Sequence, residues 1–121
     1  MRIGEFVKLC QTTKDTVRHY EELTLIQPEK TNAFKNYSQK NVDDFHVIKE
    51  LQHLGLSLKT IQELFLVKKL NGCGSKVLID QVCKELFEQD RLLSNEEMKI
   101  HEQRNYLSAL LSDLKSLNGK T

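Results

Sequence analysis

The C-terminal third of the chain sets the strongest constraint on the fold, because residues 76–118 contain neither Pro nor Gly. A helix of that span is ~65 Å long at ~1.5 Å per residue, which is more than a small core can cover. Its apolar side chains follow a heptad repeat, a pattern typical of a coiled coil. One seam of the repeat is apolar throughout: Leu86, Leu93, Ile100, Leu107 and Leu114. The pattern therefore predicts a dimerisation helix.

The companion seam of this repeat is apolar only at its ends, at Val82 and Leu110, and is polar at Gln89, Glu96 and Gln103. An antiparallel pair would bring the apolar start of each helix against the apolar end of its partner, and we predict this arrangement. A parallel zipper with a weak centre is the competing geometry. The predicted dimer interface comprises Val82, Leu86, Leu93, Ile100, Leu107, Leu110 and Leu114.

Two short helices are predicted near the start of the chain. Apolar residues recur at spacings of three and four from Ile3 to Leu9. Thr13 is a good N-cap for a second helix, which the pattern extends from Lys14 to about Leu23. Two short helices separated by a tight turn form a helix-turn-helix.

A hairpin and two further helices are predicted next. Pro28 breaks any helix, and Ile26 and Phe34 bracket a polar turn, so this segment is read as a small β-hairpin, or wing. Ser38 and Ser57 can then cap a third and a fourth helix. The segment therefore completes a winged helix-turn-helix.

The clearest break in the chain is residues 71–75, where two glycines in three residues mark a hinge. The expected fold is mainly α, with a winged helix-turn-helix domain joined to a long C-terminal dimerisation helix. The predicted divisions are the winged domain at 1–70, the hinge at 71–75, the coiled-coil helix at 76–118 and a tail at 119–121.

Charge and motif content exclude several function classes. The net charge is +1, with 11 basic and 9 acidic side chains in residues 1–70 and 7 and 8 in residues 71–121. A nucleic-acid partner would therefore be held by local contacts rather than by a generally basic surface. No acid–base pair, nucleophile elbow or phosphate loop is present, so we predict no enzyme and no cofactor. Neither a signal peptide nor an apolar run of ~18 residues is found, which predicts a cytoplasmic protein without a membrane partner.

A series of motifs in the first 70 residues resembles the MerR (mercury-resistance regulator) family. They are Ile3-Gly4-Glu5-Phe6, Thr16-Val17-Arg18-His19-Tyr20-Glu21-Glu22, Leu25-Ile26, Pro28, Asn32-Ala33-Phe34-Lys35-Asn36-Tyr37, Ile48-Lys49-Glu50-Leu51 and Leu54-Gly55-Leu56-Ser57-Leu58. The match covers about residues 2–68 in order. The resemblance implies an antiparallel homodimer that binds a pseudo-palindromic site in double-stranded promoter DNA. It also implies that RNA polymerase holoenzyme binds the same promoter. It further implies that the dimer bends and untwists the DNA, which brings the polymerase-recognition elements into register.

The resemblance also implies roles for individual residues. Those implied to contact phosphates are Arg18, Tyr20, Lys35 and Tyr37. Those implied to read base edges, at the start of the second helix, are Thr13, Lys14 and Asp15. Either tyrosine can alternatively be a core aromatic, because a ring can pack while its hydroxyl reaches a phosphate.

The sequence departs from the family pattern at several positions. Gln11, Thr24 and Asn32-Ala33 stand where the family often has Gly, in the last case Asn-Gly. Keeping a positive φ without Gly costs about 1 kcal/mol, so we expect a wing of different shape or lower order. Lys35 replaces an Arg and His19 replaces a Tyr. Because Lys cannot make a bidentate grip, we expect looser phosphate binding at the wing.

The three cysteines raise the question of sensing. Cys10 lies on an apolar helical face and is predicted to be in the core. Cys73, in its Gly-flanked loop, and Cys83 are candidate sensor thiols for a metal or an oxidant. Metal-sensing relatives use further cysteines beyond the helix, whereas no Cys or His follows His101 here. Because one thiolate does not make a tight site, we predict no bound metal cofactor.

Two other function classes stay open. One is a coiled-coil interaction protein whose winged domain is an adaptor for protein contacts. The other is an architectural protein that bends DNA with little sequence preference, whereas a regulator favours its site by roughly 10³-fold or more.

Overall fold

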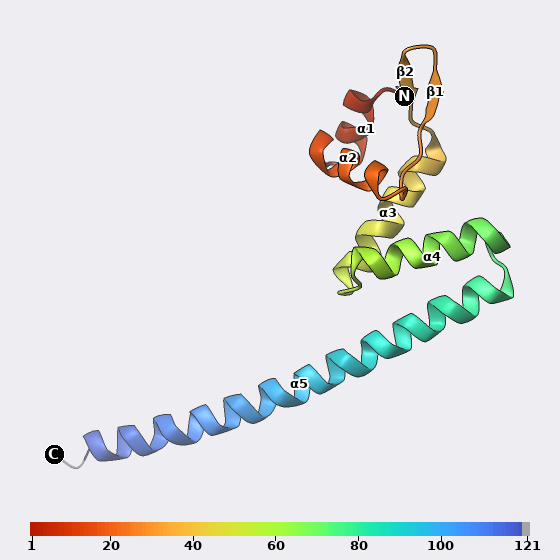
Figure 1. Ribbon diagram of the computed structural model, residues 1–121. Helices are drawn as coiled ribbons and strands as arrows, with labels where there is room; N and C mark the ends of the chain where they lie inside the picture. The colour runs from red at the N-terminus through yellow and green to blue at the C-terminus, as the bar shows by residue number, and fades with distance from the viewer. Residues whose placement is uncertain (120–121) are drawn as a thin grey trace. The chain divides into compact units, whose positions relative to one another are not determined.

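The computed structural model describes residues 1–119, which form five helices and one two-stranded hairpin (Figure 1). The elements are α1 (Ile3–Leu9), α2 (Lys14–Glu22), β1 (Glu29–Thr31), β2 (Phe34–Asn36), α3 (Gln39–His53), α4 (Leu58–Asn71) and α5 (Lys76–Asn118). The predicted fold class is confirmed: the protein is mainly helical, with a small wing and a long C-terminal helix. Of the predicted tail, only Gly119 lies within the described residues.

The chain forms two compact units, and the boundary between them in the sequence falls between Val82 and Cys83. The first unit contains α1 to α4, the hairpin and the start of α5, whose Val82 packs against the core. The second unit is the remainder of α5. Within residues 1–119, no helix has both the length and the apolar character needed to cross a bilayer.

Side-chain caps fix where α2, α3, α4 and α5 begin. The hydroxyls of Thr13, Ser57 and Ser75 each accept, at 3.2 Å, the backbone N–H of the residue three positions further on. Ser38 and Asn41 form a reciprocal capping box at the start of α3. Each cap satisfies a backbone N–H that has no partner inside the helix. The caps predicted at Thr13, Ser38 and Ser57 are confirmed.

The core of the first unit gathers aromatic rings from distant parts of the sequence. Phe6 of α1 stacks on Tyr37, which follows β2, with ring centroids 4.6 Å apart, and meets Phe45 of α3 edge-on at 6.1 Å. Tyr20 of α2 lies 5.7 Å from Phe45. These contacts fasten α2 and the base of the wing to the same core.

Within residues 1–119, three residues other than glycine adopt a left-handed backbone: Gln11 (φ 53°), Thr24 (φ 60°) and Asn32 (φ 58°). Gln11 and Thr24 are two of the positions where the sequence departs from glycine, whereas Ala33, which replaces the glycine of the wing tip, does not have a positive φ. The hairpin nevertheless forms, with Lys30 opposite Lys35 and Thr31 opposite Phe34. At Gln11 and Thr24 a positive φ is therefore adopted without glycine, and the cost is local strain.

Thr24 is the most strained of these three, because β-branched residues rarely adopt a positive φ. We expect Thr24→Gly to raise the free energy of unfolding by about 1 kcal/mol, measured by urea denaturation. Thr31→Gly is the matched control, since Thr31 lies in extended strand β1, where glycine should lower stability. A destabilised Thr24→Gly variant would contradict the assignment of strain.

Candidate DNA-binding surface

The start of α2 presents the residues predicted to read bases. Thr13, Lys14 and Asp15 are all exposed, whereas Val17 and Tyr20, further along the same helix, are buried. The helix is thus held by its inner face against the core, and its first turn is open to a partner. The three predicted base-reading residues lie together on the surface.

Arg18 lies on the exposed side of α2. Its Nη1 is 3.8 Å from Oδ1 of Asp15, and the two side chains are 65% and 96% exposed. An ion pair this exposed contributes little to stability, so the guanidinium can exchange Asp15 for another anion at small cost. Arg18 is therefore available to a phosphate.

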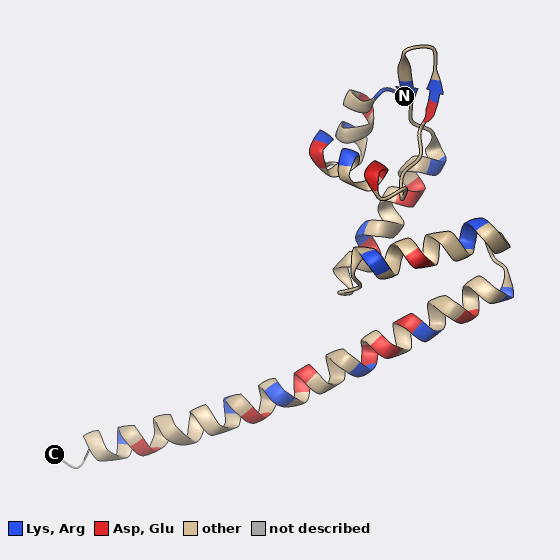
Figure 2. Ribbon diagram, viewed as in Figure 1, with Lys and Arg blue, Asp and Glu red and all other residues tan. Residues whose placement is uncertain are grey.

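The wing carries two cations side by side. Lys30 of β1 and Lys35 of β2 are directly opposite in the hairpin register, so their side chains share one face. Figure 2 shows basic residues on both wing strands and on α2. Lys30 is a candidate contact that the sequence analysis missed, since only the register places it beside Lys35.

Glu21 connects α2 to the wing. Its Oε1 is 2.9 Å from Nζ of Lys35, and its Oε2 accepts a hydrogen bond from the hydroxyl of Tyr37 at 3.1 Å. The Glu21 side chain is only 12% exposed, whereas that of Lys35 is 48% exposed. The carboxylate therefore anchors Lys35 to α2 and still leaves part of the Lys35 ammonium accessible. Glu21 belongs to the Thr16–Glu22 motif of the sequence analysis, but its partners, Lys35 and Tyr37, could be identified only from the fold.

The pKa of Tyr37 is raised to about 12, first because the phenol is buried and then because of the negative charge of Glu21 and its hydrogen bond. The folded state therefore holds the phenol proton more tightly than the unfolded chain, whose ordinary value is 10.0. The resulting stability is complete below pH ~10 and is lost as the pH rises towards 12.

Glu21→Gln should move the pKa of Tyr37 back towards its ordinary value, because it removes the negative charge beside the phenol. Ultraviolet titration of phenolate absorbance measures this change, and Tyr37→Phe identifies the tyrosine concerned. If Glu21→Gln leaves the titration curve unchanged, the carboxylate does not face the phenol in solution.

Tyr20 also has a buried ring, and its hydroxyl donates a hydrogen bond to Oε1 of Gln52 on α3 at 2.7 Å. Both predicted tyrosines therefore serve the core through their rings and have internal partners for their hydroxyls. Phosphate contact by either hydroxyl stays a prediction.

Arg2 is a second candidate contact that the sequence analysis missed. Its guanidinium lies 3.8 Å from the centroid of the Phe34 ring on β2, a cation–π geometry. The backbone N–H of Tyr37 donates to the carbonyl of Met1 at 2.7 Å, which ties the segment before α1 to the base of the wing. Arg2 was not found by helical periodicity because it precedes the first helix.

The cysteines differ in their surroundings. Cys10 is buried in the core as predicted, and burial raises the pKa of its thiol, which makes it less reactive. Cys73 and Cys83 are exposed. In the part of the chain that the structure describes, no group of three His, Cys, Asp or Glu side chains could hold a metal ion.

Two short helices with an exposed first turn on the second, a two-stranded wing and a supporting third helix define a winged helix-turn-helix protein. Residues 1–67 match the sequence model of the MerR HTH family regulatory proteins. The chain belongs to this family.

Three relatives illustrate the similarity. The chain is 46% identical over 65 residues to the mercuric resistance operon regulatory protein of Bacillus cereus, over 52% of this chain and 49% of the relative. It is 43% identical over 61 residues to the multidrug-efflux transporter 2 regulator of Bacillus subtilis (strain 168), over 49% of this chain and 22% of the relative. It is 32% identical over 69 residues to the transcriptional regulator ZntR of Escherichia coli (strain K12), over 55% and 49%. The alignments thus span about half of the length of these relatives, or less.

A solved structure extends the likeness of fold beyond the winged domain. The transcription regulator PbrR691 from Ralstonia metallidurans CH34, in complex with lead(II), superposes with a TM-score of 0.55 over 87% of this chain and 85% of that chain. The sequence identity is 22%. This similarity supports the fold, including the presence of a long helix after the winged domain.

Proposed function

We propose that this protein is a transcription regulator that binds pseudo-palindromic promoter DNA as a homodimer and changes the shape of that DNA. The observation that carries this proposal is the exposed first turn of α2, fixed to the core and flanked by the cations of the wing. Membership of the MerR HTH family supports it. Because the proposed partner is chromosomal DNA beside RNA polymerase holoenzyme, we expect a cytoplasmic protein.

In this proposal α2 enters the major groove, which is wide enough for a helix. Lys14 can donate to guanine acceptors, Asp15 can accept from a cytosine amine, and the hydroxyl of Thr13 can do either. Arg18, further along the same helix, and Lys35, on the adjacent wing, would hold the phosphate backbone. In this arrangement the first turn of α2 determines the sequence preference, and the contacts of Arg18 and Lys35 with phosphates supply most of the affinity.

The proposed dimer rests on the apolar seam of α5. None of the described residues of α5 is buried, and Leu93, Ile100 and Leu107 are each about half exposed. Burying such a seam against a second copy removes apolar surface from water at ~25 cal/mol per Å². A two-fold partner also matches a pseudo-palindromic site, in which each half-site receives one α2.

The helix sequence favours the antiparallel arrangement. With Leu86 opposite the partner's Leu110, Val82 falls opposite the partner's Leu114, so two apolar layers form at each end. The same register sets Glu96 opposite the partner's Ile100. A parallel pair would place Glu96 against its own copy, and the two like charges would repel each other.

Arg18→Ala tests the phosphate contacts. We expect operator affinity to fall about tenfold and the dependence of log affinity on log salt to become shallower by ~1. Arg104→Ala is the control, because it removes an exposed arginine from α5, outside the proposed DNA surface. Unchanged affinity and salt dependence in Arg18→Ala would show that Arg18 makes no phosphate contact.

A nuclease footprint on DNA upstream of the protein's own gene tests the function itself. We expect a two-fold symmetric protected site with enhanced cleavage at its centre, where the DNA is distorted. Equal protection of unrelated sequences would favour the architectural protein. Absence of protection at micromolar protein and moderate salt would favour the protein-interaction adaptor.

An effector can be sought in the same assay. Cys73 and Cys83 are exposed thiols and stay our candidates for sensing a metal or an oxidant. Repeating the footprint with metals and oxidants, on the protein and on Cys73→Ser and Cys83→Ser, tests each thiol separately. A footprint that changes with the same reagents in both serine variants would remove both thiols from consideration.

A further inference from the structure

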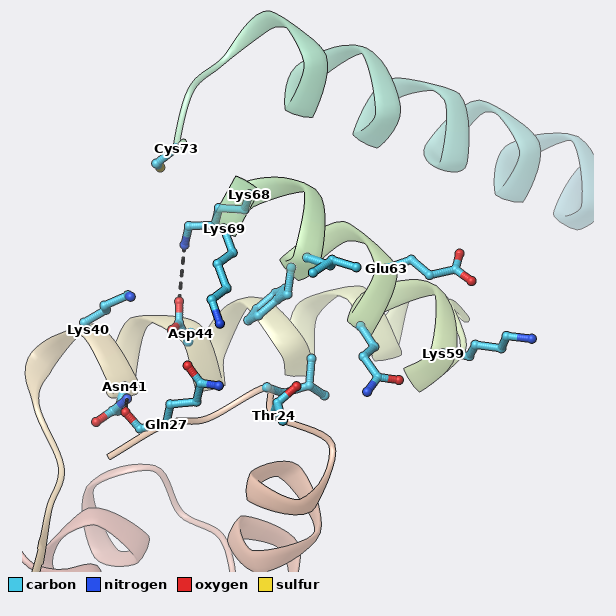
Figure 3. A pocket seen from close by; sticks show the side chains of 14 residues that line it. Thr24, Gln27, Lys40, Asn41, Asp44, Lys59, Glu63, Lys68, Lys69 and Cys73 are labelled. Atoms are coloured by element: carbon cyan, nitrogen blue, oxygen red, sulfur yellow. Dashed lines mark hydrogen bonds and ion pairs between the residues drawn. The ribbon is translucent and has the colours of Figure 1, made fainter. Parts of the chain in front are cut away.

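A hollow of about 710 Å³ lies in the first unit, between α3, α4 and the segment that links α2 to β1 (Figure 3). Leu25, Phe65 and Leu66 form an apolar part of its lining. Small-molecule sites typically measure ~300–1,000 Å³ and combine an apolar wall with a few convergent polar groups. The proposed DNA contacts use none of the residues that line this hollow.

Lysines gather at one end of the hollow. Figure 3 shows Lys40 from α3 and Lys68 and Lys69 from α4 around Asp44, with Cys73 on the same side. Nζ of Lys68 is 3.4 Å from Oδ1 of Asp44. Among residues 1–119, no hydrogen bond or ion pair involves the ammonium groups of Lys40 and Lys69. This end of the hollow therefore has two positive charges in excess.

The other charged residues of the lining do not cancel this excess. Lys59 and Glu63 lie at the opposite end, and their charged groups point away from the hollow (Figure 3). Asp44 is 12% exposed and already paired with Lys68. An anion is consequently the ligand that the charges favour, and the apolar wall favours one with a hydrophobic body.

Hydrogen bonds hold the walls of the hollow together. Nε2 of Gln62 on α4 donates to the carbonyl of Leu23 at 2.8 Å, and Nδ2 of Asn41 on α3 donates to the carbonyl of Gln27 at 3.3 Å. Both bonds tie a helix to the segment after α2. A ligand would therefore bind to a largely preformed site, and binding would cost little conformational entropy.

We propose that this hollow binds a small organic anion, with its carboxylate, sulfonate or phosphate group between Lys40 and Lys69 and its apolar body against Leu25, Phe65 and Leu66. Ammonium groups make strong, charge-assisted hydrogen bonds to such oxygens. Binding of an anion in this hollow is a separate activity from DNA binding and does not depend on it. The test is therefore carried out without DNA.

The test is a fluorescence titration of the full chain with anilinonaphthalene sulfonate, an apolar anion, beside the uncharged dansylamide. We expect saturable binding of the anion, weakened at least about tenfold in the Lys40→Gln/Lys69→Gln double variant. The Lys84→Gln/Lys99→Gln variant loses the same charge from α5 and should bind as the unmodified protein does. Amide NMR shifts on titration should fall on Thr24, Gln27 and Leu66.

Several results would overturn the proposal. Equal binding of the two probes, or equal loss of binding in the two lysine variants, would show that no specific anion site exists. Shifts confined to residues 86–114 would place the probe on the apolar seam of α5. Binding that occurs only after the dimer is disrupted would show that a second copy of the chain, not an anion, fills the hollow.

Discussion

Replacing both Leu86 and Leu110 by glutamate is expected to convert the protein from a dimer to a monomer. In the antiparallel register these residues face each other at both ends of the helix pair, so the change removes four leucines from the interface. Burying one leucine contributes roughly 1.5–3 kcal/mol, and a buried unpaired carboxylate adds a further penalty. We expect the dimer dissociation constant to rise at least about a thousandfold, measured by sedimentation equilibrium.

Ser94→Glu/Ser108→Glu is the matched control, because it adds the same charge on the outer face of the helix. That variant should stay dimeric. If it dissociates as readily as the leucine variant, charge rather than the apolar seam controls assembly.

The direction of the helices can be tested with the same positions. In the Leu86→Glu/Leu110→Lys variant, an antiparallel pair sets each new carboxylate opposite a new ammonium, whereas a parallel pair sets like charges together. Recovery of dimerisation relative to Leu86→Glu/Leu110→Glu supports the antiparallel dimer. No recovery would favour the parallel zipper.

Phe6→Ala is expected to unfold the winged domain under mild conditions. The Phe6 side chain is fully buried and touches the rings of both Tyr37 and Phe45, so its loss opens a cavity where α1, α3 and the base of the wing meet. Such truncations cost about 3–5 kcal/mol, a large part of the ~5–15 kcal/mol that stabilises a typical domain. Urea unfolding followed by near-ultraviolet circular dichroism measures the loss.

Phe34→Ala is the control for this change, because the Phe34 ring lies on the wing and is 53% exposed. We expect it to alter the free energy of unfolding by less than about 1 kcal/mol. A Phe6→Ala variant as stable as this control would show that the aromatic cluster does not hold the wing to the core.

The helices and their starts were predictable because their causes are local. The caps at Thr13, Ser38 and Ser57 act on backbone groups within one turn, and apolar periodicity marks the inner face of each helix. The exposed first turn of α2 follows from the same pattern, since Val17 and Tyr20 take the inner face. The run without Pro or Gly between residues 76 and 118 likewise predicted the bounds of α5.

The partners of the site residues could not be predicted, because they depend on how distant segments meet. Nothing in the local sequence shows that Glu21 holds both Lys35 and Tyr37, or that Lys30 stands opposite Lys35. From the sequence alone, the hydroxyl of Tyr20 could bind either a phosphate or a partner inside the protein. The fold places Oε1 of Gln52, on α3, 2.7 Å from this hydroxyl.

The sequence by itself determined the order of the elements, the family and the apolar seam of the long helix, since periodicity, caps and motifs are written in neighbouring residues. Tertiary structure alone decided which charges are paired and which are free. It brings Glu21 to the wing and leaves Lys40 and Lys69 around a hollow that α3 and α4 enclose. The physical reason is that ion pairs and cavities depend on distances across the fold, and packing of the whole core sets those distances.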